Sequence, residues 1–289
     1  MSSSEGYILN AVQTPGPLLP VYRAVDRGAK TTDAITKETG IESGLRELLS
    51  GLQLLRMIGK EDGEYYTSDY RWNLHDEQLN FRLTALHNLS KETIDGTTRN
   101  STVDEDMWGK QSVALLNYAY LLNEDVQYFE NDDNALYSDI DDWFTEINYQ
   151  PRSQQGVYDH NDPKFGNWAR LAQYLGLVHK IRGREHTVYP DRKLILASVD
   201  LATTEADLTV DGAPAIGMDE YLAWLRQNLL FVEPTADGAI PEGIARVLFE
   251  LVREGEIEFV EYGDAGAMGM DGVPAGEGIA SEANTISLI

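Results

Sequence analysis

A ladder of leucines gives the clearest periodic signal in the first quarter of the chain. Five leucines recur at intervals of three and four residues, which places them on one helical face: Leu45, Leu48, Leu49, Leu52 and Leu55. Two segments before the ladder, 18–27 and 33–39, also have helical patterns, and Thr31 or Thr32 can cap the second. After the ladder, apolar residues flank an acidic turn over 57–67. The pattern predicts three helices followed by a two-stranded hairpin.

Residues 32–41, followed by the leucine ladder and Leu54–Ile58, resemble the winged-helix family of archaea and bacteria. The resemblance covers about fifty residues and implies a fold while leaving the function open. Residues 18–68 are also similar to the N-terminal winged-helix domain of small-molecule O-methyltransferases. Those enzymes need a nucleotide-binding half with a glycine-rich loop, and the sequence after residue 70 has no such pattern. We therefore expect no enzyme and no cofactor.

The rest of the chain extends this organisation. After a first winged helix over 1–70, residues 71–135 predict a helical linker region with a polar loop at 91–106. Residues 136–200 look like a second winged helix, in which strands at 177–181 and 184–189 follow a helix that starts near Pro163. Residues 201–262 have the pattern of a third, and the glycine-rich segment 263–289 predicts a flexible tail. The expected fold class is mainly α with small β-wings (α+β), with two or three winged-helix modules joined by the helical linker region.

The distribution of charge distinguishes the second predicted module from the other two. The chain has 48 Asp and Glu against 23 Lys and Arg, a formal net charge of -25. Such acidity resembles the proteins of salt-loving archaea, so the charge describes the host more than the partner. Residues 151–200 differ, because eight basic and five acidic side chains give them a local balance of +3. The second winged helix is therefore the one module whose charge favours DNA.

Several classes of function are excluded. The chain has no cysteine, which excludes disulfides, thiolate catalysis and cysteine-based zinc sites. It has no apolar run of membrane-spanning length, and residues 1–5 do not resemble a secretory signal. We expect a cytoplasmic protein with no membrane partner. His160, beside Asp159 and Asp162, is the nearest approach to a metal-binding group, but loop carboxylates are common in an acidic chain and no metal site is predicted.

The candidate DNA-binding residues lie in the second module. Those on its last helix share the face opposite Trp168 and Leu171, and the others lie on the hairpin: Lys164, Asn167, Arg170, Gln173, Tyr174, Lys180, Arg182, Arg184 and His186. Asn and Gln side chains can pair with adenine, and Arg with guanine or phosphate. These residues predict a helix that reads bases in double-stranded DNA while a hairpin contacts the backbone. The alternative is a solvated polar face beside an ordinary turn.

The other two modules suggest a different function. The first hairpin has an acidic turn, and the strand at 257–262 contains Glu258 and Glu261, which repel phosphates. We therefore expect modules one and three to contact a protein partner or a second copy of the chain. Two hypotheses remain open. The first is a non-enzymatic DNA-binding protein that uses the second winged helix, as a transcriptional regulator or DNA-associated assembly factor. The alternative is an adaptor or scaffold subunit of a multi-protein complex, such as one for chromosome maintenance or antiviral defence, without direct DNA contact.

Overall fold

The computed structural model describes residues 6–100, 108–149, 158–262, 266–270, 272 and 282–289. About 51% of the chain is helical and 16% is strand in small sheets, which confirms the mixed α+β class. The chain forms two compact units, each built from two stretches: residues 1–116 with 131–175, and residues 117–130 with 176–289. Among the described residues, no helix combines the length and the apolar character needed to cross a membrane.

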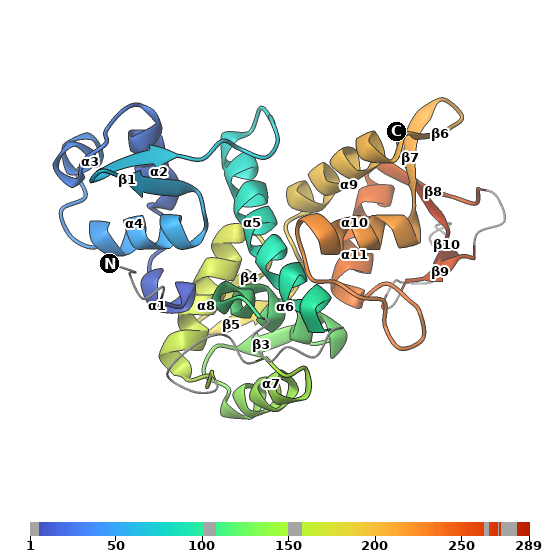
Figure 1. The fold of residues 1–289 in the computed structure, drawn as a ribbon. Coiled ribbons are helices and arrows are strands. Elements are labelled where there is room, and N and C mark those ends of the chain that lie inside the picture. Colours follow the sequence, from blue (N-terminus) through green and yellow to red (C-terminus); the bar gives the residue numbers. More distant parts are fainter. Residues whose placement is uncertain (1–5, 101–107, 150–157, 263–265, 271, 273–281) are drawn as a thin grey trace. The chain divides into compact units, whose positions relative to one another are not determined.

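Three helices and a hairpin begin the first unit, as the sequence predicts (Figure 1). They are α2 (Leu18–Asp26), α3 (Thr32–Thr39), α4 (Leu45–Leu54), β1 (Ile58–Glu61) and β2 (Glu64–Thr67). Thr31 caps α3 by accepting a hydrogen bond from the Ala34 amide at 3.3 Å. Gly40 ends this helix in the left-handed region at φ 71°. All five leucines of the ladder are buried, so the apolar face of α4 is part of the core.

Helix α5 (Glu77–Asn100) occupies much of the segment predicted as a polar loop over 91–106. Leu89 and Thr93 are buried, and the Thr93 hydroxyl donates to the Leu89 carbonyl at 3.0 Å. The loop prediction is therefore wrong for 91–100, because the helix continues to Asn100 in spite of the polar composition. Residues 101–106 of the predicted loop lie outside the described residues.

The predicted second module, 136–200, is divided between the two units. Helices α7 (Asn134–Glu146) and α8 (Asp162–Leu175) lie in the first unit, after η1 (Lys110–Ser112) and the start of α6 (Val113–Asn123). Strands β4 (His179–Arg182) and β5 (Glu185–Thr187) lie in the second. The reason is strand pairing: β5 pairs on its other side with β3 (Tyr128–Glu130), a strand inside the region predicted to be a helical linker.

A short helix that the sequence analysis did not predict, α1 (Ile8–Ala11), completes the first unit. Ile8, Leu9 and Val12 are buried, and α1 packs against α4 and α8. Gly51 of α4 permits this contact, because a Cβ atom at Gly51 would lie 2.4 Å from Val12 Cγ2. The absence of a side chain at Gly51 therefore determines how closely α1 approaches α4.

Gly51→Ala is expected to lower the free energy of unfolding by about 1–3 kcal/mol, although alanine has the higher helix propensity. The added methyl group overlaps Val12, which is 1% exposed. Urea unfolding measures the loss. In a double-mutant cycle with Val12→Ala, the second substitution should relieve the overlap, so losses that simply add would contradict the contact.

Among the described residues, the second unit contains two sheets of more than two strands. The first is three-stranded in the order β3-β5-β4, and Gly183, at φ 51°, forms the turn between β4 and β5. The hairpin predicted from 177–181 and 184–189 is thus confirmed over a shorter length. The second sheet is four-stranded in the order β6-β7-β11-β8, and all of its strand pairs are antiparallel.

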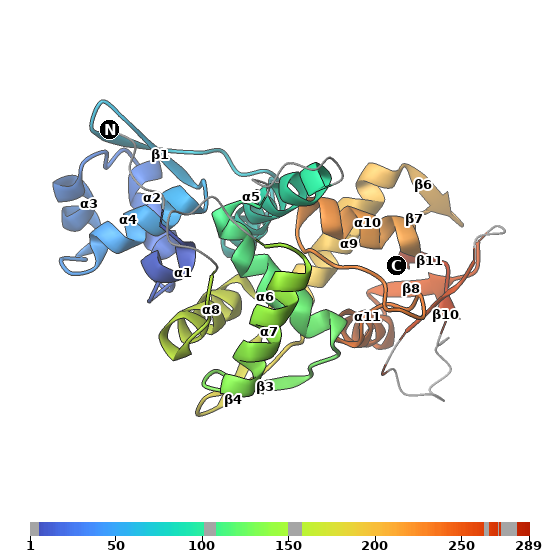
Figure 2. The ribbon, with the colours of Figure 1, turned by 60° about the horizontal axis from the view of Figure 1, so that its bottom comes forward.

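Three helices pack with this four-stranded sheet (Figure 2). The elements are α9 (Arg192–Ala206), β6 (Leu208–Val210), β7 (Ala213–Gly217), α10 (Met218–Asn228), α11 (Glu242–Arg253), β8 (Ile257–Val260) and β11 (Thr285–Leu288). Asp191 caps α9 by accepting a hydrogen bond from the Lys193 amide at 2.8 Å. A further pair, β9 (Met268–Gly269) with β10 (Glu282–Ala283), lies between β8 and β11 in the chain.

Strand β11 corrects the prediction of a flexible tail over 263–289. It lies between β7 and β8, and Thr285, Ile286 and Ser287 are buried. The glycines that suggested flexibility precede the strand, whereas Thr285 and Ile286 are β-branched residues that favour strands. The sheet that contains β8 therefore includes a strand beyond residue 262, outside the predicted bounds of the third module. Residues 263–265, 271 and 273–281 of the predicted tail lie outside the described residues.

Candidate functional site

Part of the polar face of α8, predicted to read bases, is covered by the segment around α1: Asn167 is buried there, whereas Arg170 is exposed although it contacts the same segment. Asn167 is 8% exposed, and its Nδ2 donates to the Leu9 carbonyl at 2.7 Å. Arg170 Nε donates to the Gln13 carbonyl at 2.8 Å, and its Nη2 contacts Asn167 Oδ1. Asn167 therefore has a structural role, and its side chain does not lie where a base edge could reach it.

The other candidates on α8 are partly available. Gln173 is exposed. Lys164 is half-buried, where its ammonium group contacts the Asp159 carbonyl and lies 4.6 Å from the centre of the Tyr158 ring. Tyr174 is also half-buried, with Arg82 5.9 Å from the centre of its ring, and burial raises the pKa of Tyr174 to about 12. Tyr174 is thus a packing residue, and Gln173 remains the open polar position.

The hairpin of β4 and β5 presents the predicted cations to solvent. Lys180, Arg182 and Arg184 are exposed, and 85% of the Arg182 side chain is accessible. Arg182 Nε forms an ion pair with Glu185 at 3.1 Å. His186 differs, because it is 2% exposed and stacks on Phe129 with ring centres 5.2 Å apart. The structure thus brings three of the predicted cations together on one hairpin and places His186 in the core beneath it.

His186 gives the second unit a pH-sensitive component of stability. Burial lowers the pKa of His186 from its usual value near 6.5, so the unfolded chain binds this proton more readily than the folded one. The associated stability is complete above about pH 6.5 and declines as the pH falls below it. His186→Phe keeps the stack on Phe129 and should flatten the decline in urea midpoint between about pH 7 and pH 5. His179→Gln, at an exposed position, should leave the decline unchanged. An equal decline in both variants would contradict the assignment.

Helix α11 has the same kind of internal polar contacts as α8. Glu242, 8% exposed, accepts a hydrogen bond from Gln127 Nε2 at 2.7 Å and forms an ion pair with Arg246 at 2.5 Å. Arg246 lies 5.5 Å from the centre of the Tyr189 ring. These partners all belong to the second unit, so Glu242 and Arg246 are engaged within it, whereas Glu250 and Arg253 of the same helix are exposed.

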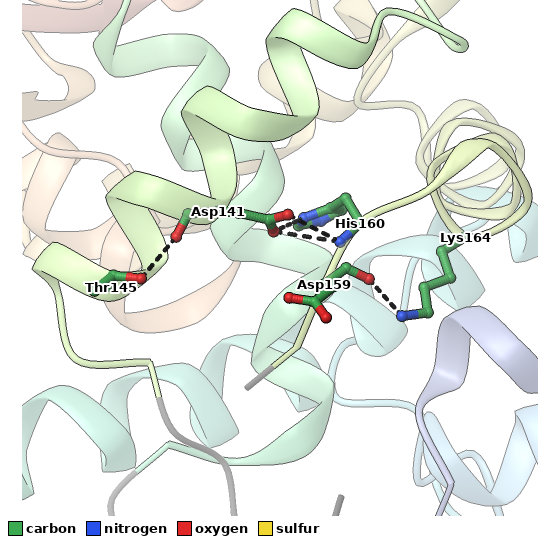
Figure 3. A network of polar contacts seen from close by, with 5 residues as sticks. All are labelled: Asp141, Thr145, Asp159, His160 and Lys164. Atoms are coloured by element: carbon green, nitrogen blue, oxygen red, sulfur yellow. Dashed lines mark hydrogen bonds and ion pairs between the residues drawn. The ribbon is translucent and has the colours of Figure 1, made fainter. Parts of the chain in front are cut away.

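The group around His160 is a structural network (Figure 3). His160 Nδ1 lies 2.6 Å from Asp141 Oδ1, and its backbone amide donates to the same carboxylate. The histidine side chain is fully buried, with Phe144 and Tyr158 against its ring. Asp141 thus ties α7 to the chain just before α8. In the part of the chain that the structure describes, no group of three His, Asp or Glu side chains could hold a metal ion.

Exposed apolar side chains follow a consistent pattern that the sequence analysis did not identify. Among the described residues, the large exposed hydrophobic side chains are Tyr66, Tyr128, Ile181, Tyr262 and Ile289. Tyr66, Tyr128 and Ile181 lie in β2, β3 and β4, and the other two follow β8 and β11 within two residues. Each of the three predicted modules therefore exposes apolar side chains on or beside its strands, and none of these five lies in a helix.

Comparison of the chain with protein-family models, curated proteins and solved structures found no match. The geometry of the exposed strands is therefore the basis for a functional proposal. Their charges and apolar side chains define what each surface can bind.

Proposed function

We propose that this chain is a non-enzymatic adaptor with three winged-helix modules, which binds protein partners through its strands. The observation that carries the proposal is the position of the exposed apolar side chains, all of which lie on or beside strands in the described part of the chain. Aromatic residues and arginine are enriched in protein interfaces relative to the rest of the surface. Tyr66 and Ile181, 51% and 49% exposed, lie on two different hairpins.

The order of elements supports three winged-helix modules. A winged helix runs helix, strand, helix, helix, strand, strand, and its last strand lies between the other two. The elements α6, β3, α7, α8, β4 and β5 follow this order, and β5 lies between β3 and β4. So do α9, β7, α10, α11, β8 and β11, with β11 in the middle. In the first module, the residue before α3 takes the position of the first strand: the Tyr65 amide of β2 donates to the Lys30 carbonyl at 2.8 Å.

The internal contacts of α8 and α11 favour an adaptor over a base-reading protein. A winged helix that reads DNA inserts its third helix into the major groove, which requires an accessible polar face. In the second and third modules this helix is α8 or α11, and Asn167 and Glu242 are buried in contacts within their own units. Base contacts by Asn167 or Glu242 would require those contacts to break.

Capture of partner proteins by the tagged full-length chain tests the adaptor function. Wild type should retain a protein from its native cells at a stoichiometric level, and Tyr66→Ser, Tyr128→Ser or Ile181→Ser should release it. Gln173→Ser, an exposed change on a helix, is the matched control and should retain it. If no retained protein depends on these three strand side chains, the adaptor function is wrong.

A second candidate is contact with the DNA backbone through the β4–β5 hairpin, which the exposure of Lys180, Arg182 and Arg184 favours. Three neutralised phosphates give a slope of about −2.7 for log affinity against log salt concentration. A titration of random duplex DNA at several salt concentrations measures this slope. Arg182→Glu/Arg184→Glu should abolish binding, whereas Lys37→Glu/Arg46→Glu, with the same charge change on exposed helical positions, should retain most of it. No binding by folded wild type at any salt concentration would contradict this candidate.

A further inference from the structure

Two hairpins of this chain have opposite charge and similar apolar exposure. The basic hairpin, residues 179–187, exposes Lys180, Arg182 and Arg184 and contains one carboxylate, Glu185. Its local balance is three positive charges against one negative. Ile181, 49% exposed, lies between two of the cations in β4. The basic hairpin thus combines one exposed apolar side chain with a positive local charge.

The acidic hairpin, residues 58–67, has the complementary composition. It exposes Glu61, Asp62 and Glu64 against one cation, Lys60, and Tyr66 beside them is 51% exposed. The local balance is three negative charges against one positive, the reverse of the basic hairpin.

Strand pairing within the acidic hairpin adds a reason for it to attract cations. Glu61 and Glu64 are direct cross-strand partners, and like charges in that position repel each other. Lys30 lies 3.4 Å from Glu64, but both side chains are more than half exposed, so solvent screens this pair. Cations brought from another molecule would relieve the remaining repulsion between the two carboxylates.

We propose that the basic hairpin of one chain docks on the acidic hairpin of a second copy, with Ile181 against Tyr66. The proposal rests on the adaptor function, since it names a partner for two of its strand surfaces. A second copy is favoured because the two charge balances are equal and opposite and each surface has one apolar side chain of nearly equal exposure. Every chain has both surfaces, so two copies contain both halves of the contact.

The contact is expected to depend strongly on salt. Ion pairs between exposed side chains are individually weak, and the Debye length falls from about 10 Å at 0.1 M salt to about 3 Å at 1 M. Association should therefore be largely lost near 1 M salt. At low ionic strength the local attraction between the hairpins has to exceed the repulsion between two chains that each have a formal net charge of -25.

Sedimentation velocity of the full chain at about 100 μM and 0.05 M salt tests the proposal. Wild type should form dimers or larger species that dissociate as salt rises. Arg182→Glu/Arg184→Glu and Glu61→Lys/Glu64→Lys should each sediment as monomers. An equimolar mixture of these two variants should associate again, because the first variant keeps the acidic hairpin and the second keeps the basic hairpin that docks on it. Lys37→Glu/Arg46→Glu, with the same charge change as the first variant on exposed helical positions, should associate like wild type.

Each other outcome overturns the self-association. It is wrong if wild type is monomeric at low salt, if the mixed variants stay monomeric, or if the control variant dissociates equally. Monomeric wild type that still captures a protein through Tyr66 or Ile181 would leave the adaptor function standing. Monomeric wild type that captures no protein, and binds duplex DNA only with Arg182 and Arg184 present, would overturn both and assign the basic hairpin to nucleic acid.

Discussion

Replacing Ile286 with aspartate is expected to lower the free energy of unfolding of the second unit by about 3–5 kcal/mol. Ile286 is fully buried in β11, where it pairs with Ile216 of β7 and Phe259 of β8. A carboxylate at this position loses its hydration and gains no cation among these neighbours. Urea unfolding measures the loss, and hydrogen exchange should show reduced protection of the amides in β7 and β8.

Ile289→Asp is the matched control for this prediction. It makes the same chemical change three residues further along, where the side chain is 76% exposed, and should alter stability by no more than about 0.5 kcal/mol. If Ile286→Asp were as mild as its control, β11 could not be the central strand of the four-stranded sheet.

Trp168→Ala is expected to lower the free energy of unfolding of the first unit by about 3–5 kcal/mol. Trp168 is 1% exposed in α8, and its ring centre lies 4.8 Å from that of Phe165. Its Nε1 donates to the Ala114 carbonyl at 2.9 Å. The substitution therefore leaves a cavity and removes a buried hydrogen bond. Thermal or urea unfolding measures both together.

Trp168→Phe separates the two contributions. Phenylalanine keeps most of the ring packing and removes the hydrogen bond, so the loss should be clearly smaller than for alanine, although the Ala114 carbonyl loses its donor. Equal losses in the two variants would mean that the hydrogen bond, and not packing, determines the cost.

The local pattern of apolar and polar residues predicts the helices and strands of this protein better than it predicts which of them pack together. The leucine ladder of α4 and the face of α8 with Trp168 follow the helical period, and the structure has both. Helix α1 and strand β3 were missed because they have only four and three residues. Their signals are weak: Ile8, Leu9 and Val12 fit one turn of helix, and Val126–Phe129 is a short apolar stretch.

The candidate DNA-binding residues also show that local pattern does not predict long-range packing. Spacing of 100° per residue correctly placed Gln173 on an exposed face of α8, but it also placed Asn167 there. Asn167 is buried by Leu9, which lies 158 positions earlier in the chain. No local pattern contains such a contact. The cations of the hairpin were found because a tight turn exposes its side chains whatever the rest of the fold does.

The division of the chain into two units limits how recombination of the gene can transfer them. The chain enters the second unit after Leu116, returns to the first after Glu130 and leaves it again after Leu175. A single crossover in the gene therefore cannot transfer one unit intact, unlike the usual case of domains joined end to end. A cut near Leu175 would leave β5 without β3, and a cut near Leu116 would separate α7 and α8 from α1. A single crossover can therefore transfer the two units only as a pair.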